Sequence, residues 1–302
     1  MIAGAAVPVI INAGAGNPHV DKRVNELTEL FAARDLPVDV RLAKSGDELD
    51  ALMHDAAAAR PRLLIAAGGD GTISTAAAAF VDSSTVLGVL PFGTLNHFAK
   101  DLHIPLELEE AVGTILDGYS IAVDVGEVNG RVFINNSSLG LYPDMVRDRE
   151  RQQTRLGRGK WRSLVLASIA AFRRYPFMTV RIDLEGQKRV HVTPIVFVGN
   201  NEYVMEGFDI GARECIDGGK FSIYIVKKQG RAALVRLSLQ ALIGRLRQAR
   251  DFEALEAAEF VIETRHSRIL VATDGEVQAM STPLHFRLRP KSLRVIVPRV
   301  PV

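Results

Sequence analysis

The chain has 302 residues with a formal net charge of only +2 at pH 7, and 47% of its residues are hydrophobic and 24% charged. This composition excludes a highly charged disordered chain and predicts a globular protein long enough for two domains. Aromatic residues make up 6% of the chain and are not interleaved with basic residues, so we expect no nucleic-acid partner.

The first part of the chain alternates between short apolar runs and helical patterns. Helices are expected after Pro18, after a capping box formed by Ser45 and Glu48, after Thr72, and over 109–117. Strands are expected at 6–11, 38–42, 63–67, 86–90 and 121–125. Because strands alternate with helices, residues 1–125 are predicted to form an α/β domain with a parallel sheet.

A glycine-rich turn, Gly68-Gly69-Asp70-Gly71-Thr72, follows the expected strand 63–67 and precedes a helical pattern. A strand, a glycine turn and a helix in this order aim backbone N–H groups at a phosphate. The carboxylate of Asp70 would repel a bare phosphate, so it indicates a Mg²⁺ between the two, as in phosphoryl-transfer sites. A tight turn without a ligand is the alternative.

A second glycine turn, 90–96, follows the next strand of the same sheet. Gly93 and Thr94 could offer N–H and hydroxyl donors to a phosphate, and Asn96 could bond a nucleotide. Ligands of parallel sheets bind beyond the carboxyl ends of the strands. Two such turns at successive strand ends therefore predict a nucleotide site.

The pattern of expected elements changes after Asp124, where short strands are no longer joined by regular crossover helices. Helical stretches are expected only near 161–174 and 231–249. A β-sandwich is predicted over 126–288, and the last apolar run, 293–297, could return to either domain. Strands are expected at 131–137, 178–184, 190–198, 221–226, 259–263, 269–273 and 284–288.

Two acidic turns in this second part are candidate sites. Asp274-Gly275-Glu276 could supply a general base and a partner that orients it, although Asp-Gly is also the commonest hairpin turn. The turn Asp217-Gly218-Gly219-Lys220 could hold a structural cation, and a solvated turn is the alternative.

A basic segment, 147–162, contains an aromatic residue, Trp161, and could rest on anionic lipid headgroups at the inner face of a membrane. An exposed loop that leads into a helix is the alternative. The single cysteine, Cys215, and the lack of an apolar run of bilayer length predict a cytoplasmic protein. The sequence is also compatible with an oligomer.

Taken together and in this order, these motifs resemble the diacylglycerol kinase catalytic-domain family, in its soluble bacterial lipid-kinase branch. The resemblance covers nearly the whole chain, and segment 68–72 matches the central motif of the family without a change. The segments that carry it are 12–16, 68–72, 90–99, 121–126, 133–140, 217–221 and 274–276.

The resemblance implies an α/β nucleotide-binding domain, 1–125 with 289–302, and a β-sandwich lipid-substrate domain, 126–288, with ATP and Mg²⁺ in the cleft. Asp274 would be the general base, with Glu276 supporting it. Asp70 and Asp124 would organise Mg²⁺, and Asp217 would sit at a structural metal. The nucleotide-binding residues would be Asn12, Gly14, Gly16, Gly68, Gly69, Asp70, Gly71, Thr72, Gly93, Thr94 and Asn96.

The expected function is that of an ATP-dependent lipid kinase, which transfers the γ-phosphoryl group to a hydroxyl of a lipid such as diacylglycerol. One departure concerns the metal, because many members carry Asp where this chain has His97, and a charged imidazole repels Mg²⁺. A kinase of a soluble substrate, such as NAD or a sugar phosphate, is one alternative. A nucleotide-binding regulatory protein with little turnover is another.

Overall fold

The computed structural model describes residues 6–14, 20–140, 177–203, 213, 215–226 and 252–299. The chain divides into two compact units, Met1–Val125 with Arg289–Val302 and Gly126–Leu288. Several predictions fall outside the described residues: Gly16, the basic segment 147–162, and the helical stretches near 161–174 and 231–249.

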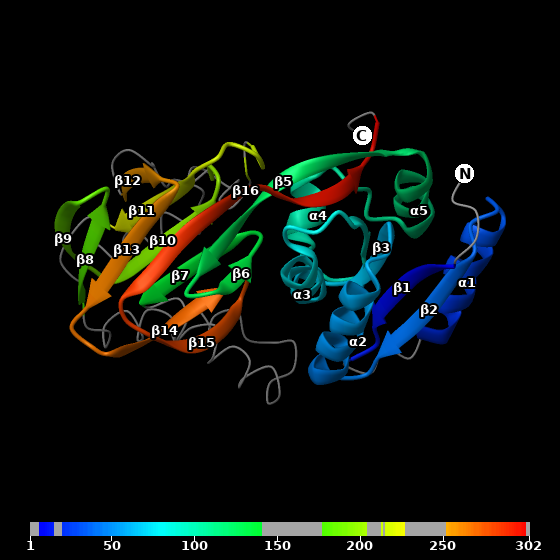
Figure 1. The fold of residues 1–302 in the computed structure, drawn as a ribbon, viewed down its shortest axis with the longest axis horizontal. Coiled ribbons are helices and arrows are strands. Elements are labelled where there is room, and N and C mark those ends of the chain that lie inside the picture. Colours follow the sequence, from blue (N-terminus) through cyan, green and yellow to red (C-terminus); the bar gives the residue numbers. More distant parts are fainter. Residues whose placement is uncertain are drawn as a thin grey trace, which may run out of the picture. The chain divides into compact units, whose positions relative to one another are not determined.

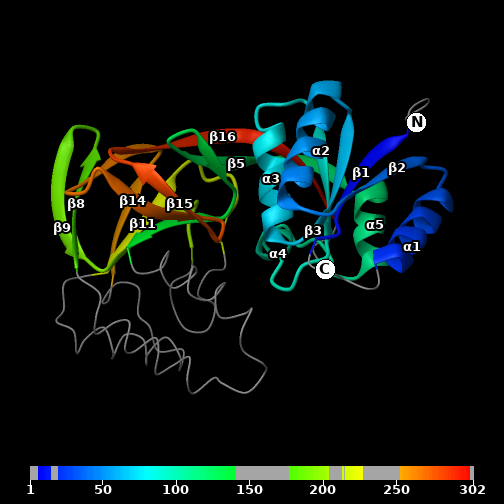
Figure 2. The ribbon, with the colours of Figure 1, turned by 90° about the horizontal axis from the view of Figure 1, so that it is seen from below.

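The first unit is an α/β layer structure (Figure 1). Strands β2, β1, β3 and β4 form a parallel sheet in that order, and Val295 near the end of β16 pairs in parallel with Leu87 of β4. Helices α1 and α5 pack together on one face of this sheet, and α2 and α3 pack together on the other (Figure 2). The elements are β1 (Val7–Asn12), α1 (Val20–Ala32), β2 (Val38–Ala43), α2 (Gly46–Ala59), β3 (Leu63–Gly68), α3 (Asp70–Phe80), β4 (Val86–Pro91), α4 (His97–Asp101), α5 (Leu108–Asp117), the first part of β5 (Tyr119–Val128) and the end of β16 (Leu284–Val297).

The local signals explain why these elements form where they do. All six residues of β3 are buried, as expected for a parallel strand that is covered on both faces. Helix α2 starts at the predicted cap, where the Oγ of Ser45 accepts the N–H of Glu48 at 3.2 Å. The Glu48 carboxylate accepts the N–H of Lys44 at 2.7 Å, one residue earlier than in a standard capping box.

The second unit is a sandwich of antiparallel sheets, so the predicted combination of an α/β domain and a β-sandwich domain is confirmed. One sheet has the order β12-β11-β10-β7-β14-β15, and the other contains β16, β13, β8 and β9 in that order, while β6 pairs with β5. The strands are β6 (Arg131–Phe133), β7 (Asn136–Gly140), β8 (Met178–Leu184), β9 (Gln187–Thr193), β10 (Ile195–Asn200), β11 (Phe221–Val226), β12 (Phe252–Ala257), β13 (Glu259–Thr264), β14 (Arg268–Thr273) and β15 (Glu276–Ser281).

Aromatic side chains fill the core of this sandwich. Phe260 of β13 and Phe286 of β16 stack with their ring centroids 4.6 Å apart. Phe221 of β11, in the other sheet, meets Phe260 edge to face at 5.8 Å. These rings are fully buried and join the two sheets, which gives the unit its own hydrophobic core.

Three expected strand boundaries were wrong. The strand expected at 131–137 is broken into β6 and β7 at residues 134–135. The strand expected at 190–198 is broken at Pro194, because proline has no N–H to donate to a sheet. In contrast, the runs 284–288 and 293–297 belong to one long strand, β16. No helix in the described part of the chain is long and apolar enough to cross a membrane.

Candidate active site

Strands β1 and β3 flank the point where the parallel sheet changes its direction of growth. The chain passes from β1 outward to β2, and then returns to β3 on the other side of β1. Such a switch point leaves a crevice at the carboxyl ends of the strands, where open α/β sheets bind ligands. Asn12 ends β1 and Gly68 ends β3. The predicted nucleotide-binding segments that begin at these two residues therefore both start at this crevice.

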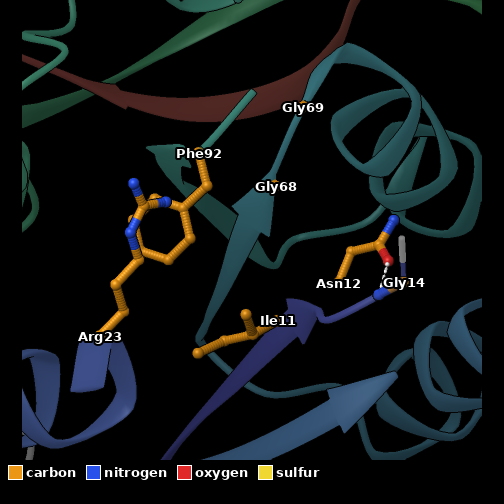
Figure 3. A pocket seen from close by; sticks show the side chains of 7 residues that line it. All are labelled: Ile11, Asn12, Gly14, Arg23, Gly68, Gly69 and Phe92. Atoms are coloured by element: carbon orange, nitrogen blue, oxygen red, sulfur yellow. Dashed lines mark hydrogen bonds between the residues drawn. The ribbon is translucent and has the colours of Figure 1, made fainter. Parts of the chain in front are cut away.

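Side-chain hydrogen bonds join the loop after β1 to the start of α3. The Nδ2 of Asn12 donates to the Oγ1 of Thr72 at 3.0 Å. The Oδ1 of Asn12 accepts the N–H of Gly14 at 2.9 Å, as Figure 3 shows. The two ends of one amide therefore hold two loops that the sequence placed 60 positions apart. This accounts for an asparagine at the end of a buried strand.

The two glycine turns touch each other through their backbones. The N–H of Phe92 donates to the carbonyl of Gly68 at 2.9 Å. A Cβ placed on Gly93 would lie 2.5 Å from the Cα of Gly69, and a Cβ placed on Gly68 would collide with the Thr72 side chain. Only glycine allows this approach, so these positions have a steric reason for their residue type.

A pocket of about 160 Å³ opens between the loops at these strand ends. Three of its lining residues, Ile11, Arg23 and Phe92, were not among the predicted site residues. The guanidinium carbon of Arg23 lies 4.8 Å from the centre of the Phe92 ring (Figure 3). Phe92 could have been found as part of the second glycine turn, but Arg23 lies on a helix and has no local signal. The lining residues are Ile11, Asn12, Gly14, Arg23, Gly68, Gly69 and Phe92.

The structure uses Asn96 to close the second glycine turn. Its Oδ1 accepts the N–H of Gly93 at 3.0 Å, and its Nδ2 donates to the carbonyl of Gly93 at 2.9 Å. The side chain is only 6% exposed. The Gly93 N–H that was predicted for a phosphate therefore has a partner within the turn, whereas Thr94 is exposed. A nucleotide contact of Asn96 stays a prediction.

The predicted magnesium ligands of this unit both accept backbone hydrogen bonds. Asp70 and Gly71 are the first two residues of α3. The Oδ1 of Asp70 accepts the N–H of Phe98 in α4 at 3.3 Å. Asp124 is only 1% exposed, and its Oδ1 accepts the N–H of Lys291 at 2.8 Å. His97 is exposed at the start of α4. No group of three or more His, Cys, Asp or Glu that could hold a metal occurs among the described residues.

In the second unit, Asp274 and Gly275 form the two-residue turn of the β14–β15 hairpin. Thr273 pairs with Glu276 across the turn, and Asp274 and Gly275 have φ angles of 48° and 88°. Positive φ at both central residues is the type I′ pattern that matches the twist of a hairpin. The hairpin alternative for this motif is therefore right, and a catalytic role of the same residues stays a prediction.

The carboxylate of Asp274 binds the backbone at the break between β6 and β7. Its Oδ1 accepts the N–H groups of Asn135 and Asn136 at 2.8 and 3.1 Å, and its Oδ2 accepts the N–H of Ile134 at 2.8 Å. Hydrogen bonds to an ionised group are roughly twice as strong as neutral ones. The break that the strand pattern at 131–137 did not reveal is thus held by this carboxylate.

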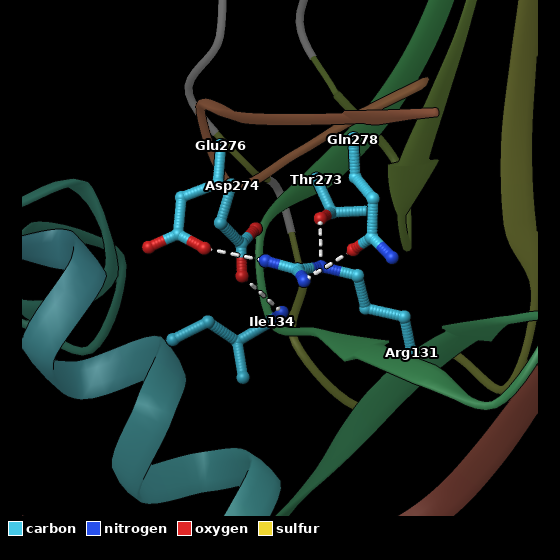
Figure 4. A network of polar contacts seen from close by, with 6 residues as sticks. All are labelled: Arg131, Ile134, Thr273, Asp274, Glu276 and Gln278. Carbon is cyan, nitrogen blue, oxygen red and sulfur yellow. Dashed lines mark hydrogen bonds and ion pairs between the residues drawn. The ribbon is translucent and has the colours of Figure 1, made fainter. Parts of the chain in front are cut away.

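Arg131, at the start of β6, holds the acidic turn from its other side (Figure 4). Its guanidinium donates to the Oγ1 of Thr273 at 2.8 Å and to the Oε1 of Gln278 at 2.6 Å, and it forms an ion pair with Glu276. Glu276 was predicted to support Asp274. Its partner in the structure is Arg131, so any support reaches Asp274 through the turn.

The carbonyl groups of the same break are also engaged. The Nδ2 of Asn200 donates to the carbonyl of Ile134 at 2.9 Å, and Arg213 donates to that carbonyl at 2.7 Å. Arg213 also donates to the Oδ1 of Asn135 at 3.3 Å. Side chains from distant parts of the unit therefore hold both the N–H and C=O groups of this short segment, which fixes its path.

The protein's relatives agree with this architecture. Residues 6–128 match the diacylglycerol kinase catalytic domain family, and residues 143–297 match the YegS C-terminal NAD kinase beta sandwich-like domain family. A diacylglycerol kinase from Staphylococcus aureus (strain JH9) is 31% identical over 227 residues, which cover 68% of this chain and 69% of the relative. The chain belongs to the diacylglycerol kinase catalytic-domain family.

Other members of this family are similar over most of their length. A diacylglycerol kinase from Bacillus subtilis (strain 168) is 27% identical over 241 residues, which are 78% of both proteins. The crystal structure of a diacylglycerol kinase from Bacillus anthracis str. Sterne superposes with a TM-score of 0.73 at 25% identity and covers 98% of both chains. The family resemblance read from the motifs is confirmed, and it assigns the chain to the kinases, which are phosphotransferases.

Asp217, which the family resemblance places at a structural metal, lies exposed in the loop before β11. Nearby, Lys220 forms an ion pair with Glu256 of β12, and this carboxylate raises the pKa of Lys220. The described residues around Asp217 include no cluster of metal-ligating side chains. A metal at Asp217 stays a prediction.

Replacing Arg131 with methionine is expected to lower the free energy of unfolding by about 1–2 kcal/mol, because three donors to the acidic turn are lost from a side chain that is 36% exposed. Urea denaturation checks this value. The matched control is Arg181→Met, which removes a single exposed ion pair with Glu263 and should cost about 0–1 kcal/mol. Equal losses for the two variants would contradict a special role of Arg131.

Proposed function

We propose that the protein is an ATP-dependent lipid kinase, which transfers the γ-phosphoryl group of ATP to a hydroxyl of a lipid such as diacylglycerol. The observation that carries the proposal is the pocket at the β1–β3 switch point, which is lined by Asn12 and by the glycines of two strand-end loops. Family membership supports the same activity.

The residues around this pocket fit a nucleotide with a divalent metal. Gly68 and Gly69 line the pocket with backbone alone, which lets backbone groups face a phosphate. Asp70, next to these glycines, suits a Mg²⁺ that is held by one or two carboxylates and by phosphate oxygens, and Asp124 is a second carboxylate in the same unit. When bound, Mg²⁺ would neutralise charge that develops on the phosphates during transfer.

The proposed transfer moves one proton and one phosphoryl group. The lipid hydroxyl loses its proton to the Asp274 carboxylate, and its oxygen forms a new bond to the γ-phosphorus. The bond between that phosphorus and the bridging oxygen breaks, and ADP leaves. In this scheme Arg131 and Glu276 hold the turn that presents Asp274, and positioning supplies most of the rate enhancement.

The test is transfer of radiolabel from γ-labelled ATP, with Mg²⁺, to a panel of lipid alcohols in mixed micelles. The panel contains diacylglycerol, a sphingoid base and phosphatidylglycerol. We expect a labelled lipid phosphate whose formation requires both the metal and the lipid. NAD and a sugar phosphate are included as soluble acceptors, because the domain family matched by residues 143–297 is described as NAD kinase-like in its sandwich.

The other outcomes are equally clear. Label in a soluble acceptor without any in lipid would identify a kinase of a soluble substrate. Binding of ATP without label in any acceptor would favour a regulatory protein.

We also propose peripheral contact with an anionic membrane surface. Co-sedimentation with vesicles should then increase with anionic lipid content and decrease with salt.

A further inference from the structure

We propose that Arg23 recognises the phosphate groups of the bound nucleotide, and that Phe92 holds the Arg23 guanidinium in place for this contact. The inference rests on the proposed nucleotide site and adds to it a residue that neither the glycine motifs nor the family resemblance assigned.

The charge of the pocket lining selects an anion. Among the described residues that line the pocket, Arg23 is the charged one, and the other polar groups there are the Asn12 amide and the backbone of glycines. The guanidinium is planar, always protonated and rich in donors, so it suits bidentate contact with phosphate oxygens. A lining whose described part carries a cation and no carboxylate favours a negatively charged ligand.

Phe92 explains how a long side chain is kept in one place. The guanidinium carbon of Arg23 lies 4.8 Å from the centre of the Phe92 ring, which is within cation–π range (Figure 3). Both side chains are half-buried. A guanidinium carries its N–H groups in the plane at its edge, so a cation–π contact through its face would leave these donors available to a ligand.

The place of Arg23 in its helix argues against a purely local role. It lies in the first turn of α1, where the positive end of the helix dipole disfavours a cation, and the last turn of α1 has no basic residue. No ion pair formed between described residues includes Arg23. A cation in the first turn of a helix is locally unfavourable, and such unfavourable positions are expected where a residue has a binding or catalytic role.

The size of the pocket favours phosphates as the part of the nucleotide that is enclosed. The volume of about 160 Å³ is smaller than the range of roughly 300–1,000 Å³ that is typical of pockets for whole drug-sized ligands. The glycine backbones of Gly68 and Gly69 line the same space as Arg23. Backbone amides and a guanidinium together are the usual surroundings of a bound phosphate.

The experiment compares ATP, ADP and adenosine by isothermal titration calorimetry with Mg²⁺ on the whole chain. Arg23→Gln should weaken ATP and ADP binding about 10- to 100-fold, the usual worth of charge-assisted hydrogen bonds, and leave adenosine within about twofold. Arg23→Lys should lie between, because it keeps the charge but loses the planar fork. Phe92→Leu should weaken ATP binding about threefold to tenfold, because the guanidinium loses its support.

Lys22→Gln is the matched control, since Lys22 is exposed in the same helical turn and does not line the pocket. It should change ATP affinity less than about twofold. Equal losses from Lys22→Gln and Arg23→Gln would overturn the inference in favour of general attraction. An equal loss of adenosine binding in Arg23→Gln would also overturn it. A wild-type chain that binds neither ATP nor ADP would instead sink the proposed function.

Discussion

Asp274→Asn is expected to lower turnover of the lipid kinase reaction by about 10²–10⁴-fold, the usual worth of a general base, with little change in ATP affinity. Asparagine cannot accept the proton of the lipid hydroxyl, although it tolerates the positive φ of 48° at this position. Steady-state kinetics with saturating lipid measure the change in kcat, and calorimetry measures ATP affinity separately.

The same substitution also has a structural cost. In Asp274→Asn an amide nitrogen replaces one carboxylate oxygen, so the N–H groups of 134–136 bound by that oxygen lose their acceptor, and the remaining bonds lose the negative charge. We expect the free energy of unfolding to decrease by about 1.5–3 kcal/mol, the usual worth of hydrogen bonds to a charged group. Kinetics must therefore be measured where urea titration shows that the variant is folded.

Asp183→Asn separates the catalytic effect from the structural one. Asp183 belongs to another hairpin of the same unit, and its Oδ1 accepts the N–H of Gly186 at 2.9 Å. This control should lose some stability and retain full turnover. If Asp274→Asn also retains turnover while folded, Asp274 is a backbone anchor and not the general base.

Gly93→Ala is expected to be the most damaging single-methyl change at the nucleotide site. The added Cβ would lie 2.5 Å from the Cα of Gly69 and 2.7 Å from the Oδ1 of Asn96. Since one of these neighbours is backbone, the two glycine turns must move apart. We expect a loss of about 2–4 kcal/mol in the free energy of unfolding and roughly 100-fold or more in ATP affinity.

Gly113→Ala is the matched control for this change. It makes the same substitution in α5, where the new Cβ would meet no described atom within 4 Å beyond its chain neighbours and the helix's own backbone. Because alanine has the higher helix propensity, the control should gain about 0.5–1 kcal/mol and bind ATP normally. Calorimetry and urea denaturation of both variants check the prediction. Normal ATP binding by folded Gly93→Ala would show that the contact between the turns is dispensable.

Much of the first unit could be predicted, because its strands read as apolar runs or as regular alternation, and β1 and β3 end in asparagine and glycine. The strand expected at 63–67 is β3, and Gly68 and Gly69 at its end line the pocket. The crevice between β1 and β3 depends on the order of the strands in the sheet, and the alternation of strands and helices along the chain does not fix that order. Arg23 could not be found, since its distance from Phe92 depends on how α1 packs and not on any local pattern.

The second unit was harder, because its signals depend on long-range pairing. The sandwich could be predicted from many short strands, but the break at 134–135 could not, because no proline or glycine in 131–137 marks it. The break exists because a carboxylate about 140 positions further along the chain binds its N–H groups. Glu276 likewise forms an ion pair with Arg131, which lies 145 positions away in the chain.

The order of residues alone was enough to say which strand ends carry glycines and which turns carry carboxylates, because burial and backbone preference act between near neighbours. It was also enough to recognise the kinase family. The three-dimensional arrangement settled what each polar group contacts: Asn96 closes its own turn, and Asp274 holds a broken strand. Those partners follow from packing between distant segments, since hydrogen bonds form with whatever donor the fold brings within about 3 Å.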